Sequence, residues 1–220
     1  MVLTYRPVGW GSVTLIYRVT MPKPVKLPPA SRRAEICRTA AKIFRDRGFD
    51  ATAMSDVARA LKMTKAGLYH YFASKEAMLF EIMRFGLERM EAEVIGPASR
   101  IREPEARLRQ MLLHHARIIT RAEGAVAQLF HEQRALPPVM RKVVNELERR
   151  YFHMVRDTLK QLKAAGRLRD VDLSISALSL IGMIQWLPRW FRPDGRLTND
   201  QAAREITDLA LAAVLKPKKK

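Results

Sequence analysis

A short segment beginning at Lys65 carries side chains that suit contact with DNA. Lys65, Tyr69 and His70 supply a positive charge and hydrogen-bonding groups for base edges and phosphates. At about 100° per residue, Leu68 and Phe72 share one side of a helix. His70 points away from that side, Tyr69 lies on a flank, and Lys65 is long enough to swing outward. The segment therefore predicts a helix with an apolar back and a polar front.

Nearby residues are suited to binding the DNA backbone. Ser55 and Thr64 stand where two helices are expected to begin, and helix N-termini bind phosphate through free N–H groups and the helix dipole. Lys75 begins a later helix and can reach a flanking phosphate. Gly67 within a short helix costs about 1 kcal/mol relative to alanine. We therefore expect a close approach there, either to DNA or to a neighbouring helix.

Two short helices must position these groups. Val57, Ala58 and Leu61 form the inward side of the first helix, which ends near Leu61, and the second starts after Thr64. A turn of about three residues between two such helices is the spacing of a helix-turn-helix motif, whose second helix enters the major groove.

Helical patterns continue almost to the end of the chain. Ile36, Ala40 and Phe44 give an apolar face to a first helix, which Gly48 closes. A fourth helix is expected from Lys75 to about Val94, ended by Gly96 and Pro97, with others at roughly 104–121, 124–134, 138–165, 173–191 and 199–215. Pro188 should kink or end the 173–191 helix early. Without strand patterns or internal repeats, the sequence predicts an all-α fold of about nine helices.

Composition limits the class of function. The 220 residues are 48% hydrophobic, which excludes a disordered chain, and a net charge of +18 implies a polyanionic partner such as nucleic acid. Lys and Arg outnumber Asp and Glu most strongly in the first third of the chain and at its two ends. The single cysteine, Cys37, excludes an internal disulfide and a multi-cysteine zinc site, so no metal or cofactor is expected. Without a spanning segment or signal peptide, we expect a cytoplasmic protein with no membrane partner.

The motif resembles the DNA-binding signature of the TetR/AcrR family of transcriptional regulators. The matching residues are Ala40-Ala41-Lys42-Ile43-Phe44, Gly48-Phe49, Thr52, Ser55-Asp56-Val57-Ala58, Lys65-Ala66-Gly67-Leu68-Tyr69-His70-Tyr71-Phe72 and Ser74-Lys75-Glu76. The resemblance implies DNA contacts at Lys65, Tyr69, His70 and Lys75, and positions near the DNA backbone at Thr52, Ser55, Thr64, Gly67 and Tyr71. It also implies three N-terminal helices for DNA and a larger helical domain for ligand binding and dimerisation.

These expectations divide the chain into four parts. Residues 1–30, rich in proline, form a disordered basic leader or arm, in which Met21 is an alternative start. Residues 31–76 form the helix-turn-helix domain and residues 77–215 the ligand-binding and dimerisation domain. Residues 216–220 form a basic tail.

The C-terminal part resembles a subset of these regulators. Gly182, Trp186, Trp190 and Phe191, followed by Arg192-Pro193-Asp194-Gly195, are similar to regulators of lipid, sterol and aromatic-acid degradation, which often sense acyl-CoA thioesters. The resemblance implies a dimer interface on the last two long helices, assigned to Ile181, Gly182, Trp190, Ile206, Leu209 and Ala213. The candidate lining of an apolar ligand pocket is Met111, His114, Ile118, Phe130, Tyr151, Met154 and Trp186. Trp186 also suits packing at the interface.

The expected function is that of a ligand-responsive regulator. As a homodimer it would bind a palindromic operator in double-stranded DNA, act as a repressor, and be released by a small hydrophobic or acyl-CoA effector. An enzyme is not expected, because the chain has no Walker loop, HExxH helix or G-x-S-x-G elbow, and no catalytic residue is assigned. A sequence-neutral architectural DNA-binding protein would suit the charge, but the balanced C-terminal part argues against it.

Overall fold

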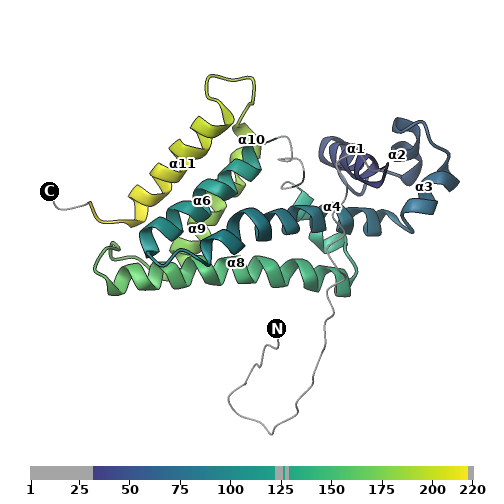
Figure 1. Cartoon of the computed structure of the whole chain (residues 1–220). Helices are drawn as coiled ribbons and strands as arrows, with labels where there is room; N and C mark the ends of the chain where they lie inside the picture. Colours follow the sequence, from purple (N-terminus) through teal and green to yellow (C-terminus); the bar gives the residue numbers. More distant parts are fainter. Residues whose placement is uncertain (1–31, 122–125, 127–128, 218–220) are drawn as a thin grey trace, which may run out of the picture.

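The computed structural model describes residues 32–121, 126 and 129–217, and within these ranges the chain is helical. The only β pairing among them is an isolated antiparallel bridge between Leu168 and Leu215. Three helices lie together at one end of the molecule: α1 (Arg32–Arg47), α2 (Met54–Ala60) and α3 (Lys65–Tyr71). The helix α4 (Lys75–Met90) leads from them into the larger helical part (Figure 1). The all-α class is confirmed.

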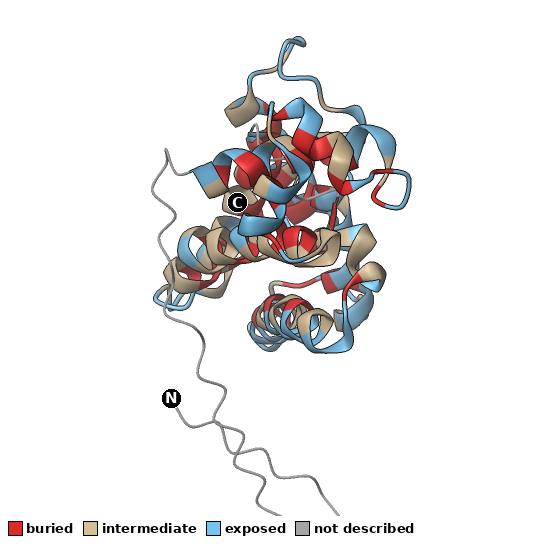
Figure 2. Cartoon of the chain, turned by 90° about the vertical axis from the view of Figure 1, so that its right-hand side faces the viewer, coloured by how far each residue is buried: buried red, intermediate tan, exposed pale blue. Residues whose placement is uncertain are grey.

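Burial of the expected apolar faces holds α1, α2 and α3 together. Ile36 and Phe44 on α1, Val57 on α2, and Leu68 and Phe72 at the back of α3 are buried in one cluster. Each fully buried side chain of this size contributes about 1.5–3 kcal/mol, so packing rather than helix propensity stabilises two helices of seven residues each. Figure 2 shows the buried positions along the inner sides of the helices and the exposed positions outside.

The caps of these helices agree with the sequence in part. The Thr64 hydroxyl accepts a hydrogen bond from the Gly67 N–H at 3.0 Å, and the Ser74 hydroxyl accepts one from the Ala77 N–H at 3.1 Å, as expected. The expectation that Ser55 caps α2 is wrong. The helix begins at Met54, and the Asp56 carboxylate accepts the Ala53 N–H at 2.9 Å instead.

The expectation that Gly96 and Pro97 end the fourth helix is also wrong. After α4 the chain widens into a π-helix, η1 (Glu91–Ile95), and continues as α5 (Gly96–Ala98). The Gly96 N–H bonds to the carbonyl of Glu91, five residues earlier. Pro97 is tolerated because it falls in the first turn of α5, where a missing N–H costs little.

The larger part contains α6 (Pro104–Thr120), the 3₁₀ helix η2 (Phe130–Ala135), α8 (Pro138–Ala164), α9 (Leu173–Gln185), α10 (Leu187–Trp190) and α11 (Asn199–Val214). Residues 124, 125, 127 and 128 of the expected 124–134 helix lie outside the described residues, and its described end, from Phe130, is the 3₁₀ helix instead of an α-helix. The expected 173–191 helix is interrupted at Trp186, where α9 ends, and Pro188 occupies the start of α10. The predicted effect of Pro188 is therefore confirmed.

The helix α4 contacts both parts of the molecule. Its buried residues from Met78 to Leu87 belong to the cluster of α1–α3, which also includes Leu129, Leu136 and Val144 from the larger part. A Cβ atom added at Gly86 would lie 2.9 Å from Val126 Cγ1 and 3.3 Å from the Phe130 ring. The segment around η2 therefore packs closely against α4. The boundary between domains at residue 76 stays a prediction.

Candidate DNA-binding and effector sites

The front of α3 is exposed, as the sequence predicts. Tyr69 is 44% exposed, and Lys65 and His70 are exposed as well, whereas Leu68 and Phe72 are buried behind them. The Lys65 ammonium lies 5.9 Å from the centre of the Tyr69 ring, a weak cation–π contact. Within the described ranges Lys65 forms no ion pair. Its charge therefore stays available to an external anion.

A shallow groove of about 500 Å³ runs beside α3. It is lined by the turn before α2, the outer side of α3 and the start of α4, and it brings together Thr52, Ser55, Lys65, Tyr69 and Lys75. Thr64, Gly67, His70 and Tyr71 are also on or beside α3 but do not line the groove. Most of the predicted DNA-binding residues thus converge on one face.

Two of the predicted DNA-binding residues form hydrogen bonds within the protein. Thr52 is only 2% exposed, and its hydroxyl donates to the Gly48 carbonyl at 2.8 Å. The buried hydroxyl is thus not available to DNA, and the position of Thr52 near the DNA backbone stays a prediction. The Lys75 ammonium donates to the Phe49 carbonyl at 2.7 Å and lies 4.3 Å from the Phe49 ring, so it also holds the turn after α1.

The crowding at Gly67 comes from the cap of its own helix. A Cβ atom there would lie 3.1 Å from the Thr64 hydroxyl oxygen, and no neighbouring helix is that close. Of the two explanations left open by the sequence, approach to another helix is excluded. Tyr71 is half-buried, and its ring meets His70 edge-on at 5.6 Å between centroids.

The sequence did not point to the residues that hold α2 and α3 in place. Arg32 Nη2 donates to the Leu61 carbonyl at 3.2 Å, and Arg33 Nη1 donates to the Tyr71 carbonyl at 2.7 Å. The positive charges thus satisfy carbonyls at the C-terminal ends of both short helices, where the dipole favours cations. No sequence pattern marks these long-range contacts.

Lys62, in the turn between α2 and α3, adopts an unusual backbone conformation. Its φ angle is 53°, in the left-handed region. The Lys62 N–H bonds to Arg59 and the Met63 N–H to Ala58, the pair of hydrogen bonds that closes a helix in a Schellman motif. Glycine usually occupies this position, so the left-handed conformation of Lys62 could not be predicted, although the turn itself was.

The candidate effector residues are divided between two regions. Met111, Ile118 and Tyr151 are buried in the cluster formed mainly by α6, α8, α9 and α11, and Met154 packs against that cluster. Phe130 packs instead against the cluster of α1–α3. His114 is half-buried, while its neighbour His115 is buried with Met111 on the inner face of α6. Assigning the ligand to this region remains a prediction.

His115 and Tyr151 form a polar pair inside this apolar cluster. Their rings meet edge-on with centroids 5.3 Å apart, and neither His115 Nδ1 nor the Tyr151 hydroxyl has a hydrogen-bond partner. Burial lowers the pKa of His115 to about 4 and raises the pKa of Tyr151. Both side chains are therefore neutral at pH 7. His114 is the histidine in the predicted pocket lining, but the apolar spacing of Met111, His115 and Ile119 favours His115 for the inner face of α6.

Trp186 does not line the interior. It is 55% exposed on the outer side of the bundle, with the Arg189 guanidinium 4.5 Å from its ring, so its assignment to the ligand pocket is wrong. Trp186 continues the exposed positions Leu178 and Gly182 at helical spacing. The sequence allowed Trp186 either to line the ligand pocket or to pack at the dimer interface. Its exposed position fits only packing against another surface.

The candidate interface residues lie on α9, α10 and α11. Gly182, Trp190, Leu209 and Ala213 are exposed, whereas Ile181 and Ile206 are half-buried against the cluster beneath. Ile175 and Leu178 extend the exposed apolar surface along α9. The helices α9 and α11 contact each other, and we call their exposed apolar side chains, together with Trp186 and Trp190, the α9–α11 face.

Metal-binding, membrane-spanning and nucleophilic features bear on other classes of function. Within the described ranges, no group of three or more His, Cys, Asp or Glu side chains is arranged to hold a metal ion, and no helix is long and apolar enough to cross a membrane. Cys37 is buried, and burial with the nearby Glu81 raises the pKa of its thiol to about 12. A protonated thiol of this kind is not a nucleophile.

Comparison with known proteins identifies the class that this geometry indicates. Residues 36–82 match the family of bacterial regulatory proteins named after TetR, and residues 102–214 match the tetracyclin repressor-like C-terminal domain. The chain therefore belongs to the TetR family and is a helix-turn-helix, DNA-binding transcriptional regulator. Membership also confirms the expectation that the protein is a regulator rather than an enzyme.

Two relatives, KstR2 and AibR, are similar over most of the chain. The transcriptional repressor KstR2 of Mycobacterium tuberculosis is 28% identical over 196 residues, covering 84% of this chain and 94% of KstR2. The structure of KstR2, a ketosteroid transcriptional regulator, superposes with a TM-score of 0.80 at 26% identity, covering 86% and 98% of the two chains. The structure of AibR with isovaleryl coenzyme A and operator DNA has a TM-score of 0.73 and 35% identity, covering 81% and 97%.

Proposed function

We propose that this protein is a repressor that binds a palindromic operator as a homodimer and leaves it when an acyl-CoA effector binds. The single observation that carries the proposal is the structure of α3, whose polar front is exposed over a buried apolar back. In such a helix Leu68 and Phe72 fix the orientation, and Lys65, Tyr69 and His70 read the major groove.

The dimer is supported by the α9–α11 face. Trp186, Trp190 and Leu209 are each more than half exposed. Exposure of such large apolar side chains is costly unless another surface covers them. A second copy packed through the same face would form a two-fold symmetric assembly. Two α3 helices about 34 Å apart then fit successive major grooves of a palindrome.

The effector class is supported by two relatives and one structural feature. AibR was crystallised with isovaleryl coenzyme A and operator DNA together, and KstR2 is a ketosteroid regulator. In this chain α4 joins α3 to the helices around the apolar cluster, and the segment at Phe130 packs on Gly86 of α4. An effector that displaces that segment would move α4 and change the spacing of the two α3 helices.

A two-stage DNA-binding measurement tests this proposal. Selection from random duplexes defines the preferred operator, and fluorescence anisotropy then measures its affinity with isovaleryl-CoA, longer acyl-CoAs and the matching free acids. We expect a palindromic operator and a loss of affinity of about 5- to 150-fold with at least one acyl-CoA.

The two stages separate the parts of the proposal. A protein that selects no preferred sequence is a sequence-neutral architectural DNA-binding protein, and the repressor proposal is then wrong. A preferred operator whose affinity no acyl-CoA changes would retain the DNA-binding part and overturn the effector class.

A further inference from the structure

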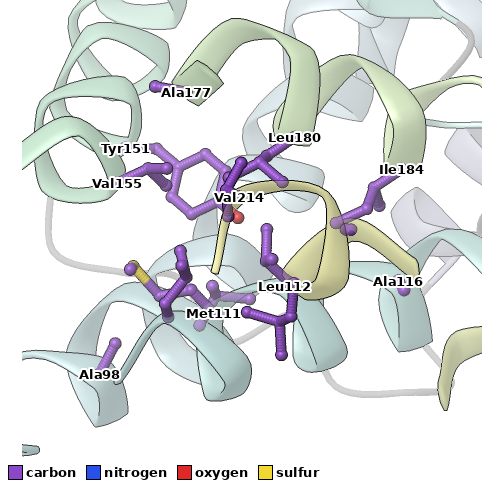
Figure 3. Packing of buried hydrophobic residues seen from close by; sticks show 14 of the residues in the cluster. Ala98, Met111, Leu112, Ala116, Tyr151, Val155, Ala177, Leu180, Ile184 and Val214 are labelled. Atoms are coloured by element: carbon purple, nitrogen blue, oxygen red, sulfur yellow. The ribbon is translucent and has the colours of Figure 1, made fainter. Parts of the chain in front are cut away.

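Within the C-terminal cluster, His115 and Tyr151 are an exception to the apolar packing. The buried residues around them include Met111, Leu180 and Val214 from three different helices. In Figure 3 the Tyr151 ring reaches from α8 into this cluster, and its oxygen lies among carbon atoms of the neighbouring side chains. Two buried polar groups without partners are unfavourable, because each has lost its hydrogen bonds to water without replacement.

The electrostatics of the pair restrict what it can bind. No Asp, Glu, Lys or Arg is buried among the described residues, and desolvation alone accounts for the lowered pKa of His115. The hydroxyl of Tyr151 is an uncharged donor in a region of low polarity, and neutral His115 is a second one in the tautomer that carries its proton on Nδ1. Such donors stabilise a neutral carbonyl oxygen, whereas a carboxylate would enter without a cation to compensate its desolvation.

We propose that His115 and Tyr151 bind the uncharged carbonyl oxygen of the effector and make the site select a thioester over the corresponding free acid. This inference rests on the proposed function, because it assigns the polar contact within the proposed effector site. The apolar residues around the pair accept the hydrocarbon part of the ligand. The binding step involves no covalent change, only two hydrogen bonds to one oxygen atom.

The test compares ligands that differ only at the carbonyl. Isothermal titration calorimetry measures binding of isovaleryl-CoA, of its thioether analogue with CH₂ in place of the carbonyl, and of isovalerate. N-acetylcysteamine thioesters and methyl ketones of the same chain serve as uncharged carbonyl probes without coenzyme A. We expect the thioester to bind about tenfold more tightly than the thioether, and isovalerate to bind least.

The variants Tyr151→Phe and His115→Phe remove the donors and keep aromatic rings. Each should weaken thioester binding by about tenfold and leave thioether binding unchanged. The melting temperature should stay the same or rise, since an unpaired buried polar group is lost. His153→Gln, which removes an imidazole from another face of α8, should change neither ligand's affinity.

Each result decides between the inference and the proposed function. If wild-type protein binds isovaleryl-CoA and its thioether equally, and Tyr151→Phe changes nothing, the inference is overturned and the proposed function stands. If no acyl-CoA binds but the small thioesters or ketones bind through Tyr151, the coenzyme A part of the proposed function is wrong and the inference stands. If none of the carbonyl probes binds wild-type protein, or if Tyr151→Phe lowers the melting temperature, the inference is overturned.

Discussion

The Lys75 ammonium, at the first residue of α4, bonds to the carbonyl of Phe49 at 2.7 Å and lies 4.3 Å from the centre of its ring. One side chain thus connects the start of the linking helix to the turn that follows α1. The same ammonium lines the groove beside α3, where DNA is proposed to bind. Lys75 therefore combines a structural contact with a position beside the phosphates.

This double position predicts two effects of Lys75→Met, which keeps most of the apolar stem. The free energy of unfolding should fall by about 1 kcal/mol, because a half-exposed charged hydrogen bond is lost. Affinity for the operator and for scrambled DNA should fall together, with a weaker dependence on salt. Urea unfolding and anisotropy titrations check the two effects. Unchanged stability with weaker DNA binding would mean that the ammonium contacts only phosphate.

The left-handed conformation of Lys62 predicts that glycine is better at this position. Lys62→Gly should raise the free energy of unfolding by about 1 kcal/mol, because glycine adopts a φ angle of 53° without steric cost. Gly166→Ala is the reciprocal variant. Gly166 has a φ angle of 68° and no atom within 4 Å of an added Cβ, so alanine should lower stability through the backbone alone. A loss of stability in Lys62→Gly would contradict the assignment.

The α9–α11 face predicts a charge-sensitive dimer. Leu209 is 60% exposed on this face, so Leu209→Glu should bury a charge between subunits and produce monomers. Val139→Glu is the matched control, because Val139 is also exposed but lies at the start of α8, away from this face. Sedimentation velocity measures both masses. A dimeric Leu209→Glu protein would exclude this surface as the interface.

His115 predicts a specific dependence of stability on pH. Its pKa is about 4 in the folded protein and about 6.5 when unfolded, so between these values the unfolded chain binds the additional proton. Above pH 6.5 this difference costs the folded state little, and the cost grows as the pH falls toward 4 because the unfolded chain is stabilised by the proton. From pH 7 to pH 5 the loss of stability should be about 2 kcal/mol.

Comparing variants isolates that contribution from other titrating groups. Urea unfolding of His115→Phe should lack this part of the pH dependence, and His153→Gln should retain it. Equal pH dependence in wild-type and His115→Phe proteins would show that the imidazole is not buried in neutral form.

The sequence predicted features that depend on local spacing. Leu68 and Phe72 fall on one side of α3 by helical periodicity alone, and the Thr64 cap and the Gly48 turn follow from residue type. The exposed front of α3 followed from the same periodicity. These elements needed no information about distant parts of the chain.

Features that depend on long-range packing could not be predicted in the same way. Thr52 is buried because its hydroxyl meets the carbonyl of Gly48 across a turn, and Arg33 reaches α3 from α1. His114 and His115 are about 100° apart on α6; the apolar spacing with Met111 and Ile119 favours His115, but its unpaired burial against Tyr151 depends on how α6 packs on α8.

The central claim is that Tyr69 and its neighbours on the front of α3 bind the operator. The most direct test is the operator affinity of Tyr69→Ala, measured by anisotropy beside Phe85→Ala, which truncates an aromatic side chain of similar exposure on α4. We predict a loss of about 5- to 150-fold for Tyr69→Ala, with unchanged helical content and dimer mass, and less than about twofold for Phe85→Ala. A folded, dimeric Tyr69→Ala protein that binds the operator as tightly as the wild type would contradict the account.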